Sequence, residues 1–230
     1  MKGLDMSETF AERLEKVERR NAEACEKAGR PRGSVRLLAV SKTKPPEAVR
    51  EAAECGVRLF GENRVQEAQS KIPMCPGGLE WHLIGHLQSN KAKVAARFFQ
   101  MVHSVDSLKL LQALESHADV TLPVLLQVNV SGEAAKFGMK PDEVAGVIEA
   151  ANEMQKVEVH GLMTIPPFSP DPEKTRIHFS NLRKLRDRLQ DKTGTPLPEL
   201  SMGMSHDLEV AIEEGSTWVR IGTDLFGSRN

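Results

Sequence analysis

Short apolar segments that alternate with helical patterns constrain the fold of this chain most strongly. Runs rich in β-branched and apolar residues predict strands, and segments with apolar residues three and four positions apart predict helices. Strict alternation of the two predicts a parallel sheet, and eight repeats in 230 residues favour a closed (β/α)8 TIM barrel over an open doubly wound sheet. The predicted strands are 35–41, 57–61, 80–85, 100–105, 122–130, 157–165, 199–204 and 217–222.

The N-terminal segment predicts an additional helix before the barrel. Residues from about Ser7 to Ala28 carry apolar side chains at helical spacing, and Thr9 and Glu12 are placed as a capping box. After the last predicted strand only TDLFGSRN remains, which is too short for a helix that closes the barrel. We therefore expect the N-terminal helix to cover that gap and residues 1–230 to form one domain.

Composition and charge exclude several classes of function. Lys and Arg number 31 against 32 for Asp and Glu, so the net charge of -1 gives no general attraction to nucleic acid. No apolar run approaches the roughly 20 residues that a membrane helix needs, and the N-terminus lacks the apolar region of a signal peptide. We expect a cytoplasmic protein that binds neither nucleic acid nor membrane.

The three cysteines give no sign of a covalent or metal framework. Cys25, Cys55 and Cys75 are far apart in the sequence and form no C-x-x-C pair. This spacing argues against disulfides and against a zinc site. We expect free thiols that pack as small hydrophobic residues.

The stretch RLLAVSKTKPP, residues 36–46, places two lysines at the end of a predicted buried strand. Because side chains alternate along a barrel strand, Leu38, Val40 and Lys42 are expected to point inward, with Lys42 still within the strand at its C-terminal end. Barrel enzymes build their sites at that end, and an amine enclosed there by apolar walls is a nucleophile toward carbonyls. The alternative is that Lys42 and Lys44 are solvated residues of the following loop.

A second group of candidates lies near the C-terminus. Ser205 follows the seventh predicted strand, and Gly222 and Thr223 follow the eighth. Barrels often hold phosphate with the loops after these two strands, where hydroxyl groups and backbone amides are available. The simpler role of Ser205 is that of an N-cap for the helix that begins near Asp207.

Arg220 lies on the eighth predicted strand, on the same face as Trp218 and Gly222. A buried guanidinium needs a partner, because an unpaired buried charge is costly. The partner is either a structural carboxylate or a ligand atom. The neighbouring phosphate and lysine candidates favour a ligand.

Taken together, seven motifs resemble those of the pyridoxal phosphate homeostasis proteins, also called the YggS or PROSC family. They run in the expected order from the first predicted strand nearly to the C-terminus, and as a set they are highly specific. The fold that this resemblance implies is the barrel of the alanine racemase N-terminal domain. The matching motifs are AVSKTKP, FGENRVQE, WHLIGHLQSNK, VNVSGE, HGLMTI, ELSMGMSHD and GSTWVRIG.

The resemblance implies that the cofactor is pyridoxal 5'-phosphate (PLP). Lys42 would bind it as a Schiff base, with Lys44 as a nearby accessory residue, and Arg220 would face the pyridine nitrogen. The loops after the seventh and eighth strands would hold the phosphate. The implied cofactor-binding residues are Lys42, Asn63, Ile84, Met204, Ser205, Arg220, Gly222 and Thr223.

Two positions depart from the family pattern. Arg64 stands where family members often have tyrosine, and His206 occupies a variable place in its motif. Neither is among the implied Schiff-base or phosphate residues, so the departures concern the edge of the pocket.

The sequence also bears on whether such a protein is an enzyme. An alanine racemase moves a proton with a lysine on one face and a tyrosine from a second domain on the other, and this chain contains no tyrosine. An arginine at the pyridine nitrogen would also weaken the ring as an electron sink. We therefore predict a protein that holds PLP and hands it over without robust turnover. The expected recipients are PLP-dependent apo-enzymes, and the expected assembly state is a monomer.

Two alternatives remain open. One is a weak racemase that uses His82, His86 or His206 as the second base, although each of these histidines has a simpler interpretation as a core or rim residue. The other is a scaffold that only binds partners, which would leave an inward lysine and arginine unexplained.

Overall fold

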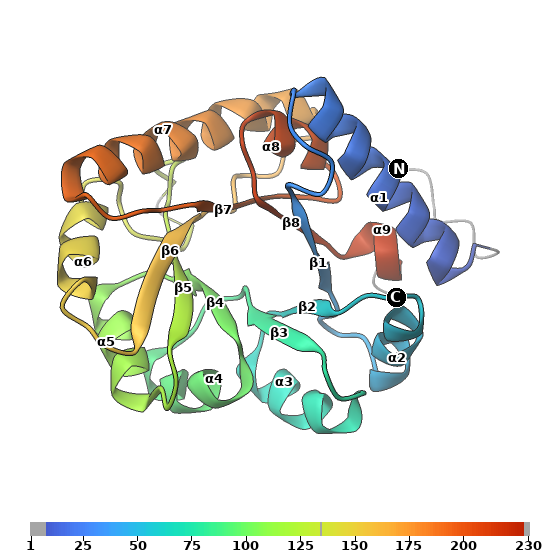
Figure 1. Ribbon diagram of the computed structural model, residues 1–230, viewed down its shortest axis with the longest axis horizontal. Coiled ribbons are helices and arrows are strands. Elements are labelled where there is room, and N and C mark those ends of the chain that lie inside the picture. The colour runs from blue at the N-terminus through green and yellow to red at the C-terminus, as the bar shows by residue number, and fades with distance from the viewer. Residues whose placement is uncertain (1–7, 134, 228–230) are drawn as a thin grey trace.

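The computed structural model describes residues 8–133 and 135–227 and contains a closed barrel of parallel strands (Figure 1). Each strand pairs with its neighbour in sequence, and β1 pairs with β8 to close the ring. The (β/α)8 prediction is confirmed, although most strands end earlier than predicted because their last residues turn into loops. The strands are β1 Arg36–Val40, β2 Leu59–Glu62, β3 Glu80–Leu83, β4 Met101–Val105, β5 Leu122–Gln127, β6 Val157–Met163, β7 Glu199–Met204 and β8 Trp218–Ile221.

Helices surround the barrel and cover the outer faces of the strands (Figure 1). Short 3-10 helices, η1 Ile72–Met74, η2 Ser89–Lys91 and η3 Pro172–Thr175, lie in the connections. The α-helices are α1 Phe10–Lys27, α2 Pro46–Glu54, α3 Val65–Lys71, α4 Ala92–Phe98, α5 Leu108–His117, α6 Val144–Ala151, α7 Arg176–Thr193, α8 Leu208–Glu213 and α9 Thr223–Phe226.

Helix α1 begins at Phe10 behind the predicted capping box. The Thr9 hydroxyl accepts a hydrogen bond from the backbone N–H of Glu12 (3.3 Å), and the Glu12 carboxylate accepts one from the backbone N–H of Thr9 (2.8 Å). These two bonds satisfy amide groups that the first turn of a helix leaves unpaired. The predicted helix start at Ser7 lies outside the described residues.

Helix α1 packs beside β8, the last strand, which is followed only by the one-turn helix α9. The Arg13 Nε group donates a hydrogen bond to the Leu225 carbonyl (2.7 Å), and the rings of Phe10 and Phe226 lie 5.3 Å apart. Arg20 forms an ion pair with Asp224 at 2.5 Å. The N-terminal helix therefore covers the gap beside β8, as predicted.

The apolar core has two layers. A large layer lies between the barrel and its helices, and a smaller cluster fills the barrel itself. Ala39 belongs to the outer layer, whereas Leu38 and Val40 belong to the inner cluster, which confirms the predicted alternation along β1. The inner cluster consists of Leu38, Val40, Ile84, Met101, Leu125, Met163 and Trp218.

Two predictions from composition can be compared with the fold. Over the described residues, no helix is both long enough and apolar enough to cross a membrane. The three cysteines are free thiols, of which Cys25 is buried and Cys75 half-buried. Cys55 is exposed, so the prediction that it packs as a small hydrophobic residue is wrong; it is the C-cap residue of α2, outside the buried face of that helix.

Candidate functional site

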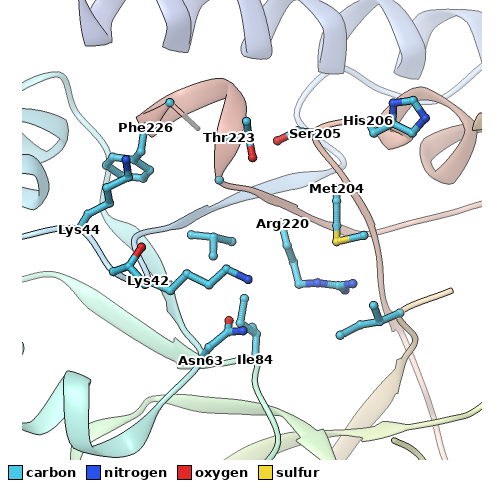
Figure 2. A pocket seen from close by; sticks show the side chains of 15 residues that line it. Lys42, Lys44, Asn63, Ile84, Met204, Ser205, His206, Arg220, Thr223 and Phe226 are labelled. Carbon is cyan, nitrogen blue, oxygen red and sulfur yellow. The ribbon is translucent and has the colours of Figure 1, made fainter. Parts of the chain in front are cut away.

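A cavity of about 280 Å³ opens at the C-terminal ends of the barrel strands (Figure 2). Its lining comes from residues at the C-terminal ends of β1, β7 and β8 and from the segments after β1, β2, β3, β6, β7 and β8, because parallel strands all end on the same side of a barrel. The structure brings together in this one cavity every residue that the sequence proposed for the site. These residues are Lys42, Lys44, Asn63, Ile84, Met204, Ser205, Arg220, Gly222 and Thr223.

Lys42 lies in a tight turn and not within a strand. β1 ends at Val40, and the prediction that Lys42 is still part of it is wrong, because the Lys44 N–H turns back to donate to the Ser41 carbonyl (3.0 Å). Thr43, at the centre of this turn, has a φ of 65°. The side chain of Lys42 points into the cavity toward Arg220, whereas that of Lys44 extends toward Phe226 (Figure 2).

A charge cluster, formed by the buried Glu62 and Lys71 and the half-buried Glu67, stabilises the turn from behind. The Lys71 ammonium donates to Glu62 (2.9 Å), to Glu67 (2.8 Å) and to the Ser41 carbonyl (2.9 Å). Glu62 also accepts from the Ser41 hydroxyl at 2.6 Å, and Glu67 accepts from the Thr43 N–H at 2.5 Å. Burial raises the pKa of the Glu62 carboxyl group, against the hydrogen bonds from Ser41 and Lys71. The cluster therefore ties the Lys42 turn to β2 and α3.

Arg220 points into the barrel from β8 and is only 3% exposed. It donates to the Ser201 hydroxyl (2.7 Å) and to the Thr164 carbonyl (2.9 Å), so its hydrogen bonds in the described structure go to neutral oxygens and not to a carboxylate. Burial lowers the pKa of Arg220 to about 10, with the charge of Asp207 acting in the opposite direction. The guanidinium therefore carries its charge at neutral pH.

Ser205 connects the loop after β7 to the helix after β8. The structure contradicts the N-cap interpretation, because Asp207 is the N-cap residue of α8. The Ser205 hydroxyl accepts instead from the backbone N–H of Asp224 in α9 (3.3 Å). This contact places the hydroxyl groups of Ser205 and Thr223 on the same side of the cavity (Figure 2), with Gly222 as the N-cap residue of α9.

The charges and polar atoms around the cavity favour an anionic ligand. Two lysines and one arginine line it, and no Asp or Glu is among its described lining residues. The side-chain oxygen of Asn63 is buried and has no hydrogen-bond partner in the described structure, so it can accept from a ligand. Ile84 and Met204 add apolar surface of the kind that binds a flat ring.

The three histidines considered as second bases have different surroundings. His82 is buried inside the barrel and is not among the residues that line the cavity. His86 contacts Asp106 (3.0 Å) and stacks on the Phe137 ring at 4.1 Å. His206 does line the cavity, and its Nε2 atom lies 2.8 Å from the Ser169 carbonyl oxygen. Arg64 is exposed and is not among the lining residues.

Sequence reasoning missed part of the lining. Most of these residues are close neighbours of predicted ones in the sequence. All residues of the loops after β1 and β8 could therefore have been proposed as lining residues. Ile165 lies two residues after the end of β6, and Ile84 lies directly after β3, so nearness to a strand end is the signal that could have identified Ile165. The missed residues are Val40, Thr43, Ile165, Phe226 and Gly227.

Comparisons with known proteins show which family this sequence matches. The alanine racemase N-terminal domain family matches residues 13–230. A pyridoxal phosphate homeostasis protein of Pseudomonas aeruginosa is 50% identical over 228 residues, with 96% of each chain covered. Another, of Aquifex aeolicus, is 48% identical over 222 residues, which cover 95% of this chain and 97% of the relative.

Solved structures show the same likeness. PipY of Synechococcus elongatus, solved with PLP bound, superposes with a TM-score of 0.83 at 39% identity and covers 95% of this chain and all (100%) of its own. An alanine racemase of Corynebacterium glutamicum has a TM-score of 0.66 at 18% identity, and the match covers only 62% of that enzyme, so it shows the fold alone. The chain belongs to the family of pyridoxal phosphate homeostasis proteins, which share the barrel of the alanine racemase N-terminal domain.

Proposed function

We propose that the chain binds pyridoxal 5'-phosphate in the cavity through a Schiff base with Lys42 and acts in the homeostasis of this cofactor as a carrier or buffer. The observation that carries the proposal is the convergence of nine proposed residues on one cavity that has cationic side chains and no described carboxylate in its lining. PLP needs these features, because it combines an aldehyde, an anionic phosphate and a flat aromatic ring. The PLP-bound structure of the related PipY supports the proposal.

The roles of the individual residues follow from their positions. Ser205, Gly222 and Thr223 would hold the phosphate where the hydroxyl groups and the start of α9 meet. Arg220 would face the ring nitrogen from the barrel interior, and Asn63 would accept a hydrogen bond with its unpartnered oxygen. Met204 and Ile84 would contact the ring, and Lys44 would assist transfer from the edge of the cavity.

Storage and delivery explain the site better than turnover. When bound, PLP supplies an electron sink that amino-acid chemistry exploits, but an arginine at the ring nitrogen opposes protonation there and so weakens the sink. Proton transfer on both faces of a substrate needs a second base, and tyrosine does not occur in the sequence. The curated relatives are named homeostasis proteins, which supports the same conclusion.

One observation favours a second candidate function, a weak amino-acid racemase. Of the three histidines considered, His206 lines the cavity and could act as a single base opposite Lys42. Its imidazole already contacts the Ser169 carbonyl and packs near the Phe168 ring at 5.4 Å, so it would have to move to reach a substrate.

We propose that the protein acts as a monomer. PLP-dependent apo-enzymes remain the proposed recipients, and the cytoplasm, where such apo-enzymes are made, remains the proposed location.

The covalent link can be tested directly. Purified protein is mixed with PLP and reduced with borohydride, and the modified lysine is located by mass spectrometry. We expect the label on Lys42, retention of this label in Lys44→Ala, and its loss in Lys42→Ala. Lys93→Ala is the matched control, since Lys93 is exposed on α4 and lies outside the cavity lining. A label that persists at another lysine in Lys42→Ala would contradict the assignment.

Turnover and delivery need separate measurements. The loaded protein is assayed for racemisation of several L-amino acids, and then for activation of a PLP-dependent apo-enzyme across a range of carrier concentrations. Efficient racemisation that disappears in His206→Gln would favour the second candidate. Transfer of PLP without racemisation, slowed in Lys44→Ala, would support the carrier function.

A further inference from the structure

A chain of hydrogen bonds runs through the inside of the barrel, from Arg220 at the cavity to Glu80 at the opposite end. The Ser201 hydroxyl oxygen lies 2.9 Å from His103 Nδ1, and His103 Nε2 lies 3.0 Å from His82 Nδ1. His82 Nε2 lies 2.8 Å from the Glu80 carboxylate. With the bond from Arg220 to Ser201, four contacts join five side chains of β3, β4, β7 and β8.

The two ends of this chain set its direction. A guanidinium can only donate, so the Ser201 oxygen accepts from Arg220 and its hydroxyl hydrogen is available for His103 Nδ1. A carboxylate can only accept, so His82 Nε2 must carry a hydrogen toward Glu80. The hydrogen bond from His82 lowers the pKa of Glu80, which keeps that carboxylate ionised at neutral pH.

The opposite arrangement of neutral rings fails at both ends. If His103 donated to Ser201, the serine hydroxyl hydrogen would lose its described acceptor. His82 would then donate to His103, and its unprotonated Nε2 would face the Glu80 carboxylate at 2.8 Å, with two acceptors and no hydrogen between them. Two facing acceptors repel each other, and the buried His82 nitrogen would have no hydrogen-bond donor.

We propose that His82 and His103 are neutral rings with their hydrogen on Nε2, and that this one-way hydrogen-bond chain makes Ser201 and His103 positioning residues for Arg220. The second half of the proposal rests on the proposed function, because it assigns Arg220 to the ring of PLP. Each link donates toward Glu80, so the Ser201 oxygen is held as an acceptor for the guanidinium. Arg220 thereby keeps one orientation as it faces the cavity.

The surroundings of His103 support a neutral imidazole. His103 is fully buried, and burial together with the charges of Arg220 and Arg36 keeps its pKa well below the usual value. Both rings pack against Trp218 in T-shaped arrangements, with ring centroids 5.0 Å and 5.6 Å away. Both nitrogens of each ring are hydrogen-bonded, so neither histidine has a free base to present to a substrate.

Nuclear magnetic resonance tests the tautomers without any cofactor. Long-range proton–nitrogen spectra of the ¹⁵N-labelled apoprotein at neutral pH distinguish a ring nitrogen that bears hydrogen from one that does not. His82→Gln and His103→Gln assign the two sets of signals, and the exposed pair of Glu158 and His160, which has the same spacing on β6, is an internal reference. We expect hydrogen on Nε2 and none on Nδ1 for His82 and His103. Hydrogen on Nδ1 of either ring, or on both nitrogens of His82, would overturn the proposed direction.

The positioning role is tested by Ser201→Ala, which removes the acceptor for Arg220, and by Ser201→Thr, which restores a hydroxyl. We expect PLP to bind about tenfold more weakly to Ser201→Ala, with a shifted absorption band for the bound cofactor, and largely normal binding to Ser201→Thr. His160→Gln serves as the control, since His160 is not part of the hydrogen-bond chain.

The possible results are separable. Wild-type affinity and an unchanged absorption band in Ser201→Ala would overturn the positioning role, as would a loss of thermal stability with no change in the band. If the wild-type protein does not bind PLP at all, the proposed function fails while the tautomer measurement still decides the direction of the chain.

Discussion

Two buried cations lie close to the proposed cofactor cavity, and they are stabilised in different ways. Lys71 is 4% exposed and contacts two carboxylates, Glu62 and Glu67, at 2.9 and 2.8 Å. Arg220 is 3% exposed and donates to a hydroxyl and a carbonyl. Lys71 does not line the cavity, whereas Arg220 does.

The difference separates a structural charge from one that can act on a ligand. A buried cation whose hydrogens all meet protein acceptors has nothing to offer a ligand, and it holds the elements that supply those acceptors together. A buried cation whose hydrogen-bond partners are all neutral keeps much of its field, and an electron-rich or anionic ligand that enters the cavity is attracted to it. Four predictions test this comparison.

Removal of the Lys71 charge should have the largest effect on stability. In Lys71→Met, Glu62 remains buried without its cation, and we expect the free energy of unfolding to fall by about 3–5 kcal/mol. Urea denaturation of the apoprotein measures this change. Lys93→Met, an exposed lysine on α4, should change stability by less than about 0.5 kcal/mol. Equal effects of the two substitutions would show that the charge cluster contributes little to the stability of the protein.

Removal of the Arg220 charge should have a smaller effect on stability and a larger one on binding. Arg220→Met relieves the burial of a cation but leaves the Ser201 and Thr164 oxygens without their donor, so we expect a net change of at most about 2 kcal/mol in the free energy of unfolding. PLP affinity should fall by about tenfold or more. A stability loss as large as that of Lys71→Met, with unchanged PLP affinity, would make Arg220 a structural charge as well.

Relief of the backbone strain at Thr43, in the turn that carries Lys42, should stabilise the protein. Thr43 adopts a φ of 65°, which is unfavourable for a β-branched residue. We expect Thr43→Gly to raise the free energy of unfolding by about 1 kcal/mol. Thr43→Ala keeps the Cβ atom, so we expect a much smaller increase in the free energy of unfolding. Equal stability of the two variants would show that the Cβ atom costs little at this φ, since the backbone N–H of residue 43 can donate to Glu67 in both.

The smallest effect should appear at the far end of the hydrogen-bond chain from Arg220, as a dependence on pH. The pKa of Glu80 is lowered in the folded protein, so the ionised group stabilises the fold above its unfolded value of 4.5, and this contribution is lost as the pH falls through the lowered pKa. In Glu80→Gln this contribution is absent, so the variant should lose less stability than the wild type between neutral and acidic pH. Because the side chain is half-exposed, we expect a difference below about 1 kcal/mol.

Urea denaturation at several pH values measures this difference. Glu158→Gln removes a carboxylate from the exposed pair with His160 and controls for the general effect of charge. The same change of acid stability in both variants would show that the contact with His82 is not responsible.

Much of the fold followed from local patterns. The alternation of apolar and helical segments predicted all eight strands, because parallel strands buried on both faces must be apolar. The capping box of Thr9 and Glu12 was predictable because it depends on residues only three positions apart. The end of β1 was not, since the turn at Lys42 depends on the Glu62 and Lys71 side chains, which come from later elements.

The candidate site followed from the sequence to a similar degree. Residues in the motifs that resemble the family were expected to meet, and they do line one cavity. The N-cap interpretation of Ser205 was mistaken, because Asp207 is the N-cap residue of α8 and the Ser205 hydroxyl accepts from Asp224 in a helix that the sequence did not predict. The chain from Arg220 to Glu80 was not visible at all, since its five residues are spread over 141 positions (220 − 80 + 1) of the sequence.

By itself, the sequence determined the order of the elements, the inward face of β1 and the residue types that reach the C-terminal ends of the strands, because these depend on the chemistry and periodicity of neighbouring residues. Only the tertiary structure decided which cation is neutralised. Lys71 and Arg220 are both buried basic residues, and the closure of the barrel placed two carboxylates beside the first and a hydroxyl and a carbonyl beside the second. The energy of a buried charge depends on the atoms within a few ångströms, and those atoms come from distant parts of the chain.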